Sequence, residues 1–359
     1  MPAEQENKHH DNPLAGDLDH ILAHTGDLWE ELRGKRLFIT GGTGFFGSWL
    51  LESFLSANKK FDLNASVLVL TRNSEEFRKR VPHLALNPAV GFHLGDVRNY
   101  SFPEGEFSHI IHAAATSAVA TFNKEDPLAK FDTVVGGTRH TLDFAVKCKA
   151  KKFLLTSSGA VYGKQPANIT RIPEDYSGAP DPSDIKSAWG ESKRAAEFLC
   201  SYYSKKYNIE TKIARCFSFV GPYLQLDVHY AIGNFIRDAL NGGPIRVNGD
   251  GTPVRSYLYA ADLAVWLWTV LFKGESCMPY NVGSEEEISI VQLADVVAQV
   301  LQVPKGVEIA RSPAHDRPPE RYVPSTRFAQ ESLGTRQVIG LKDAIKRTLA
   351  HSLSSYNFK

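Results

Sequence analysis

A glycine-rich turn between an apolar segment and an amphipathic one constrains the fold of this chain more than any other feature. In LFITGGTGFFGSWLL, residues 37–51, Gly41, Gly44 and Gly47 follow one another at intervals of three. Glycine lets the backbone turn tightly, and the free N–H groups at the start of a helix attract an anion. A strand before the turn and a helix after it therefore predict dinucleotide binding, with a packing turn as the alternative.

Short apolar strands and amphipathic helices alternate from Arg36 to Phe219. The expected strands read RLFIT, SVLVLTR, VGFHLGDV, HIIHAAA, KKFLLTSSG and TKIARCFSF. This alternation is typical of βαβ units and predicts an α/β fold with a Rossmann-type doubly wound parallel sheet. Beyond Phe219 the chain is turn-rich, which predicts a smaller C-terminal α/β lobe near the carboxyl ends of the strands, where such folds bind ligands.

These patterns predict three parts. Residues 1–35 form a polar tail and a helical arm, and residues 36–218 form the nucleotide-binding domain, to which a segment at about 262–284 returns. Residues 219–261 and 285–359 form the substrate-binding lobe.

Composition narrows the class of protein. The 359 residues carry a net charge of +1 with the charges scattered, so we expect no nucleic-acid partner. The four cysteines lie far apart in the sequence, which predicts no metal site. The polar N-terminus and the lack of an apolar run of about 18 residues predict a cytoplasmic protein without a membrane partner.

Residues after the second and third strands bear on the choice of coenzyme. Thr71 and Arg72 stand where an acidic residue would hold the ribose hydroxyls of NAD. A guanidinium suits a 2′-phosphate, so the sequence favours NADP, although Arg72 as a plain solvated charge leaves NAD open. Asp96 in GDV is placed to accept a hydrogen bond from adenine, and Val97 follows it.

Several motifs together resemble the extended short-chain dehydrogenase/reductase family, of the nucleotide-sugar epimerase/dehydratase type. They are GGTGFFG, GDV at 95–97, HAAA at 112–115, TSSGAVYG at 156–163, Lys193, GP at 221–222, GDGTPVRSYLY at 249–259 and YNVGS at 280–284. The resemblance implies a homodimer through helices at about 127–148 and 188–207. It also implies coenzyme contacts from Gly41, Thr43, Gly44, Phe45, Phe46, Gly47, Ala113, Ala114, Ala115, Lys193 and Phe217.

The resemblance places the reaction at Ser158 and Lys193, but the tyrosine that precedes the lysine by four residues in the family is Trp189 here. An indole N–H donates a hydrogen bond and cannot take up a proton. Three interpretations stay open: another group such as Ser158 with Lys193, Tyr162 or a relayed water serves as base; the protein binds ligands with little turnover; or Trp189 is a substitution in an otherwise normal epimerase.

The residues after Ser158 restrict the reaction further. Dehydratases of this family carry acidic residues there, whereas this chain has Gly159 and Ala160, so 4,6-dehydration is disfavoured. C4 epimerisation or reduction of a keto-sugar is favoured, and oxidation-linked decarboxylation stays open. A non-catalytic dinucleotide-binding protein of the same fold is the rival.

The same resemblance implies where a nucleoside-diphosphate sugar binds. Arg255 and Arg321 match arginines that clamp the diphosphate, a role that guanidinium geometry suits. The remaining candidate contacts are Ser218, Asn234, Arg237, Val247 and, as a weaker candidate, His229.

Overall fold

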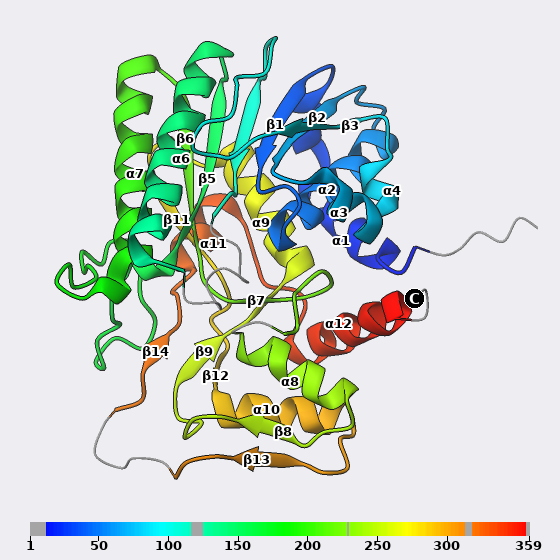
Figure 1. Cartoon of the computed structure of the whole chain (residues 1–359), viewed down its shortest axis with the longest axis vertical. Coiled ribbons are helices and arrows are strands. Elements are labelled where there is room, and N and C mark those ends of the chain that lie inside the picture. The colour runs from blue at the N-terminus through cyan, green and yellow to red at the C-terminus, as the bar shows by residue number, and fades with distance from the viewer. Residues whose placement is uncertain (1–11, 116–124, 228–229, 313–317, 357–359) are drawn as a thin grey trace, which may run out of the picture.

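A computed structural model describes residues 12–115, 125–227, 230–312 and 318–356. Its centre is a seven-stranded parallel sheet in the order β11-β6-β5-β4-β1-β2-β3 (Figure 1). The strands are β1 (Arg36–Thr40), β2 (Ser66–Thr71), β3 (Val90–Leu94), β4 (His109–His112), β5 (Lys152–Ser158), β6 (Glu210–Cys216) and β11 (Pro279–Val282). The predicted α/β fold with a Rossmann-type parallel sheet is confirmed.

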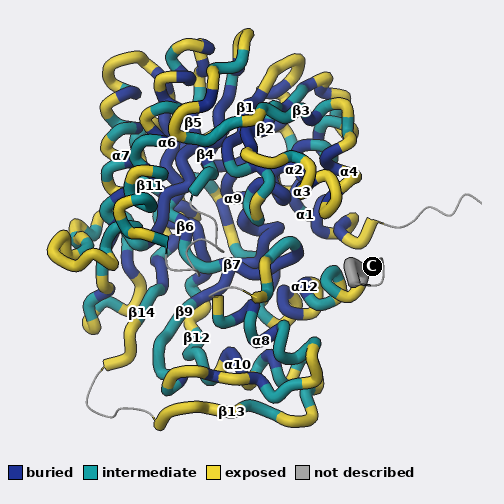
Figure 2. Tube along the Cα trace, viewed as in Figure 1, coloured by how far each residue is buried: buried dark blue, intermediate teal, exposed yellow. Residues whose placement is uncertain are grey.

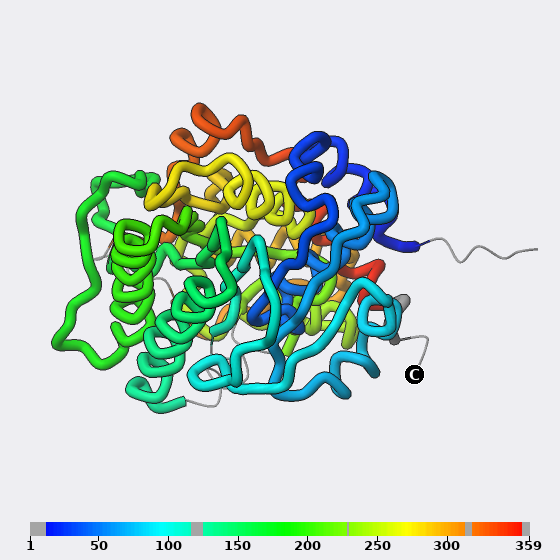
Figure 3. Tube along the Cα trace, turned by 90° about the horizontal axis from the view of Figure 1, so that it is seen from above, coloured from blue at the N-terminus to red at the C-terminus, as the bar shows by residue number. Residues whose placement is uncertain are grey.

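Helices cover both faces of this sheet, as the alternation of the sequence predicts. Two long helices, α6 (Pro127–Lys147) and α7 (Ala188–Tyr207), lie side by side against one face (Figure 3). The other face carries α1 (Ala15–Thr25), α2 (Phe45–Lys60) and α9 (Ala260–Lys273). The short elements η1 (Gly26–Leu32), α3 (Ser74–Arg80), α4 (Pro82–Ala85), η2 (Gly159–Tyr162) and η3 (Ile185–Ser187) connect these layers.

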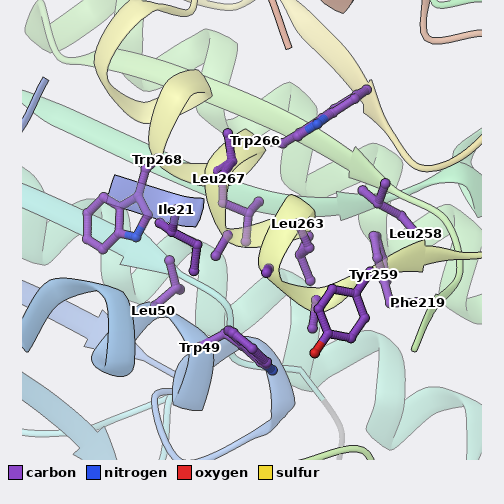
Figure 4. Packing of buried hydrophobic residues seen from close by; sticks show 14 of the residues in the cluster. Ile21, Trp49, Leu50, Phe219, Leu258, Tyr259, Leu263, Trp266, Leu267 and Trp268 are labelled. Carbon is purple, nitrogen blue, oxygen red and sulfur yellow. The ribbon is translucent and has the colours of Figure 1, made fainter. Parts of the chain in front are cut away.

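Helix α9 forms the centre of the larger core because apolar residues surround it. Every residue from Ala260 to Phe272 is buried, and Trp268 packs on Trp29 with ring centroids 4.6 Å apart. Figure 4 shows Trp49 of α2 and Tyr259 beside this helix, with their ring centroids 6.0 Å apart. Burial of each such side chain stabilises the fold by roughly 1.5–3 kcal/mol.

A smaller lobe follows the carboxyl ends of the strands and contains short sheets (Figure 1). Strands β12 (Glu287–Ser289), β9 (Val254–Ser256) and β14 (Arg321–Tyr322) form one sheet, and β13 (Val307–Ile309) pairs with β8 (Ile245–Val247). Its helix α8 (Ala231–Leu240) is buried or partly buried along its whole length, whereas α10 (Ile290–Val300) exposes Gln292, Asp295 and Gln299 on its outer face (Figure 2). The remaining elements are β7 (Phe219–Val220), β10 (Leu258–Tyr259), α11 (Arg327–Leu333) and α12 (Leu341–Tyr356).

Hydrogen bonds link the N-terminal helix α1 to the C-terminal helix α12 and to the start of α9. Asp17 of α1 is buried and accepts hydrogen bonds from Tyr259, at 2.7 Å, and from Arg347 of α12. His20 bonds the buried Asp262 of α9 at 2.8 Å. These pairs fix the predicted helical arm on the main fold. Among the described residues, no helix is both long and apolar enough to pass through a bilayer.

Candidate active site

The glycine turn between β1 and α2 is tightly packed at two glycines and open at the third. A Cβ on Gly41, whose φ is +72°, would lie 2.5 Å from the carbonyl oxygen of Ala113, and one on Gly47 would lie 2.3 Å from the backbone of Gly42. Gly44 is exposed, and its nearest neighbour would be 3.4 Å away. The N-cap residue of α2 is Gly44, which has no side chain to cap the helix, so the first N–H groups, at Phe45 and Phe46, have no capping side chain and suit an anion such as a phosphate.

The turn is held from two sides. The backbone oxygen of Thr43 accepts a hydrogen bond from Arg80, which places a guanidinium at the glycine turn. The Phe46 ring packs edge-on against Phe219, 5.1 Å away between centroids, and Phe45 packs against Phe46. These residues lie where the resemblance expects coenzyme contacts.

The adenosine side contains the candidates after β2 and β3. The Thr71 hydroxyl is used locally, because it donates to the Asn73 carbonyl at 3.1 Å. Arg72 is exposed at the strand end. The Arg98 guanidinium bonds the Asp96 carboxyl at 2.8 Å and lowers its pKa, so Asp96 is charged and acts only as an acceptor.

Two further candidates support neighbouring elements. Val97 fills the space beside Gly137 of α6, where a Cβ would lie 2.8 Å from a Val97 methyl group. The Ala114 N–H donates to Thr40 at 3.1 Å, while Thr40 also bonds the buried His112 at 2.9 Å. Burial lowers the pKa of His112 to about 3, so this imidazole is neutral and fixes the turn that carries Ala113, Ala114 and Ala115.

Ser158 ends β5, and its hydroxyl is the centre of a group of polar contacts at the position where the resemblance implies the reaction. Its Oγ accepts hydrogen bonds from the Trp189 indole N–H and the Ala160 backbone N–H, both at 3.2 Å. It also lies 3.4 Å from the Tyr322 hydroxyl. The structure thus brings Trp189 to Ser158, as the resemblance implies, and the indole N–H is the donor.

Lys193 is buried behind Trp189. Its ammonium donates to the Thr156 carbonyl at 2.7 Å and lies 5.0 Å from the centre of the Trp189 ring. Burial lowers the pKa of Lys193 to about 8, because the ammonium is removed from water. Ser158, Trp189 and Lys193 therefore meet in one site.

Tyr162, which the sequence offers as an alternative base, is committed elsewhere. Its hydroxyl donates to Asn281 and accepts from Arg215, each at 2.8 Å. Arg215 also pairs with Glu197 at 2.8 Å, and Glu197 accepts a hydrogen bond from Ser157. Burial raises the pKa of the Tyr162 phenol. This network supports β5 and β6 from the α7 side.

The two arginines expected at a diphosphate are both paired with carboxylates. Arg255 on β9 bonds Glu320 at 2.6 Å, and Arg321 on β14 contacts Glu287. These glutamates hold the guanidinium groups in place and have to release them before a phosphate can bind bidentately.

Most of the other substrate candidates lie in or beside the same lobe. On α8, Arg237 donates to Asn234 at 3.1 Å, as the one-turn spacing predicts, and pairs with Asp238. Val247 is buried in β8, and the Ser218 carbonyl accepts a hydrogen bond from Leu258. His229 lies outside the described residues.

Tyr322 is the site residue that sequence reasoning missed. Its ring packs on Phe217, one of the expected coenzyme contacts, with centroids 4.7 Å apart. A Cβ on Gly159 would lie 2.6 Å from the Phe217 ring and 2.8 Å from the Tyr322 hydroxyl. The glycine that argues against dehydration is therefore also the residue that makes room for a phenol.

Comparison with protein families places the chain among nucleotide-sugar enzymes. Residues 37–283 match the model of the NAD dependent epimerase/dehydratase family. UDP-glucuronic acid decarboxylase 3 of Arabidopsis thaliana is 31% identical over 310 residues, which are 86% of each chain. UDP-glucuronic acid decarboxylase 1 of Xenopus tropicalis is 30% identical over 319 residues, covering 88% of this chain and 71% of that protein.

Solved structures show the same fold. The UDP-glucuronic acid 4-epimerase of Bacillus cereus, in complex with UDP-glucuronic acid and NAD, superposes with a TM-score of 0.74 at 21% identity, over 90% of this chain and all of that one. The dTDP-glucose 4,6-dehydratase of Streptomyces venezuelae, with NAD bound, gives 0.75 at 23% identity, over 90% and 98%.

Proposed function

Because the chain belongs to the NAD dependent epimerase/dehydratase family, we propose that it binds a nicotinamide coenzyme at its glycine turn and catalyses hydride transfer at C4 of a nucleoside-diphosphate sugar. C4 epimerisation or reduction of a keto-sugar is the proposed reaction. The observation that carries the proposal is the Ser158 hydroxyl, held at the carboxyl end of β5 between the Trp189 N–H and the Tyr322 hydroxyl. The bound coenzyme would accept or supply the hydride.

The residues of the chain have separate tasks in this proposal. The N–H groups at Phe45 and Phe46 and the positive end of α2 bind the coenzyme diphosphate. Lys193 holds the nicotinamide ribose, and Ser158 bonds the sugar oxygen that becomes a carbonyl. Gly41, Gly44 and Gly47 suit this ligand, because the first and third close the turn and the second leaves it open.

We propose a uridine diphosphate sugar as the substrate class. The names of the relatives and the ligand of the Bacillus cereus epimerase point to UDP-glucuronic acid as the first compound to test. Arg255 and Arg321 would bind the diphosphate when Glu320 and Glu287 release them. Dehydration stays disfavoured, because neither Gly159 nor Ala160 can move a proton.

The preference for NADP over NAD stays a proposal within a family described as NAD dependent. It is supported by the exposed Arg72 at the end of β2, beside the charged Asp96. If it is right, Arg72→Ala weakens NADP binding more than NAD binding, as calorimetric titration of both coenzymes would measure. Equal effects on the two would contradict it.

A second candidate function is binding without efficient turnover. It is favoured by Trp189, whose N–H donates to Ser158 where a family enzyme has a proton-exchanging phenol. In this case the chain would act as a sensor or scaffold that holds coenzyme and nucleotide sugar.

One experiment separates these functions. Coenzyme-loaded protein is mixed with UDP-sugars, and the absorbance of the reduced nicotinamide and the sugar products are followed. Turnover that disappears in Ser158→Ala supports the enzyme, and tight binding of both ligands without turnover supports the binding protein. Full activity in both Ser158→Ala and Lys193→Ala would reject the site.

We also propose a homodimer through α6 and α7. Leu128 on α6 and Phe198 and Tyr202 on α7 are large apolar or aromatic side chains that remain exposed. Light scattering of Phe198→Glu should report monomers if these helices pair. The domain boundaries and the cytoplasmic location likewise stay predictions.

A further inference from the structure

We propose that Tyr322 supplies the proton-carrying hydroxyl that the Trp189 substitution removes from the reaction site. The inference rests on the proposed function, since it concerns the proton that accompanies redox chemistry at the sugar oxygen. Tyr322 comes from β14 of the C-terminal lobe, whereas Trp189 comes from α7, and the Tyr322 hydroxyl lies 3.4 Å from Ser158 Oγ.

The position of the phenol is fixed by three neighbours. Its oxygen lies 3.4 Å from Ser158 Oγ and 3.5 Å from the Cys216 carbonyl, and its ring packs on Phe217. A sugar oxygen that bonds Ser158 would therefore meet the Tyr322 hydroxyl as well. Trp189 reaches Ser158 with a donor that keeps its proton.

Gly159 is a second, independent observation. A Cβ at this position would lie 2.8 Å from the Tyr322 oxygen and 2.6 Å from Phe217, so a larger residue would displace the phenol. The chain thus combines three features that belong together: no phenol at position 189, no side chain at position 159 and a phenol at position 322.

The strand pairing connects Tyr322 to the proposed diphosphate site. In the parallel pair β9–β14, Tyr322 stands directly opposite Arg255. A nucleotide sugar with its diphosphate on Arg255 would extend its sugar past Tyr322 toward Ser158. A single residue pair then aligns the phosphate group and the proton donor.

The protonation of Tyr322 decides the direction in which it acts. Burial raises the pKa of this phenol to about 12, so it begins the reaction as a donor. In keto-sugar reduction the O–H bond of Tyr322 breaks and an O–H bond forms on the sugar oxygen, while the carbon receives a hydride from the reduced coenzyme. Water then returns a proton to the phenolate, which balances the step.

The test compares Tyr322→Phe with Tyr280→Phe. Tyr280 is a matched control, because it is buried, stacks on Phe328 with centroids 5.3 Å apart and accepts one hydrogen bond from a backbone N–H. We expect Tyr322→Phe to lower kcat by about 100-fold, the usual scale of a positioned proton donor. The double variant Trp189→Tyr/Tyr322→Phe should have a kcat at least about tenfold higher than Tyr322→Phe, because a phenol returns to the site. Trp189→Tyr alone should not raise kcat above the wild-type value.

Two readouts do not depend on turnover. Calorimetry should find that Tyr322→Phe weakens binding of UDP-glucuronic acid about fivefold and leaves UDP binding unchanged, because only the sugar meets the phenol. The second readout is the NMR spectrum of coenzyme-free protein with isotope-labelled tyrosine rings. The resonance of Tyr322 is the one that is absent from the spectrum of Tyr322→Phe. This resonance should shift in Ser158→Ala, because the neighbouring hydroxyl is lost.

The outcomes separate this inference from the proposed function. Wild-type turnover with fully active Tyr322→Phe would overturn the role of Tyr322 and leave the function standing. If no UDP-sugar is turned over, the function fails, and the calorimetric comparison still decides whether Tyr322 meets the sugar. Equal weakening of UDP and UDP-sugar, or none, would overturn it.

Discussion

The two halves of the site are built by different means. The proposed coenzyme half consists of backbone: three glycines and the uncapped start of α2, all within residues 41–47. The proposed reaction half consists of side chains from β5, α7 and β14, and the Ser158–Tyr322 contact joins residues 164 positions apart. A binding site made of local backbone can be recognised in the sequence. In a site assembled from distant side chains, a different residue can supply a required group at the same place in the fold, and the sequence does not show this.

The largest effect is expected for a substitution in the glycine turn, Gly47→Ala. In Gly47→Ala the new Cβ would lie 2.3 Å from the Gly42 backbone, so we expect a loss of about 3 kcal/mol or more in the free energy of unfolding and no measurable coenzyme binding. Chemical denaturation and calorimetry measure both. Gly16→Ala is the control, since nothing lies within 4 Å of its Cβ; normal binding in Gly47→Ala would contradict the assignment.

Lys193→Met tests the reaction half with two opposite effects. The folded-state pKa of about 8 lies below the usual value of 10.5, so the buried ammonium destabilises the fold below pH 8. We expect the variant to be more stable at pH 7 by on the order of 2 kcal/mol, while kcat falls about 100-fold.

The stability difference between the wild-type protein and Lys193→Met should depend on pH. The wild-type protein should gain stability relative to Lys193→Met between pH 8 and pH 10.5, because the unfolded chain then binds more protons than the folded one. Denaturant unfolding at several pH values measures the difference. A stability gap that does not change over this range would show that Lys193 has an ordinary pKa.

Arg255→Gln examines the link between the halves. Loss of a charge-assisted contact should weaken UDP binding by roughly 10- to 30-fold, with little change in coenzyme affinity. Arg327→Gln is a suitable control, because Arg327 is an exposed arginine paired with a glutamate on α11. Unchanged UDP affinity in Arg255→Gln would place the diphosphate elsewhere.

The smallest expected effect concerns Trp189→Phe. Phenylalanine retains an aromatic ring near the Lys193 ammonium and removes the N–H that bonds Ser158. One neutral hydrogen bond is worth about 1 kcal/mol, so we expect roughly a fivefold loss in kcat/KM. A loss of 100-fold or more would make the indole a central part of the mechanism.

The sequence predicted the regular and the local parts of the molecule. Strand–helix alternation identified the parallel sheet, and the family resemblance pointed to Ser158, Trp189 and Lys193, which do meet in the structure. Tyr322 gave no such signal, because β14 has two residues and follows a proline- and arginine-rich stretch without periodicity. The carboxylates that pair with Arg255 and Arg321 also depend on tertiary contacts.

A crystal structure with a nicotinamide coenzyme bound tests the central claim most directly. The account predicts the diphosphate at the N–H groups of Phe45 and Phe46, and the nicotinamide ring beside Ser158, Lys193 and Tyr322. A coenzyme that does not bind, or one whose ring lies away from these three side chains, would contradict it.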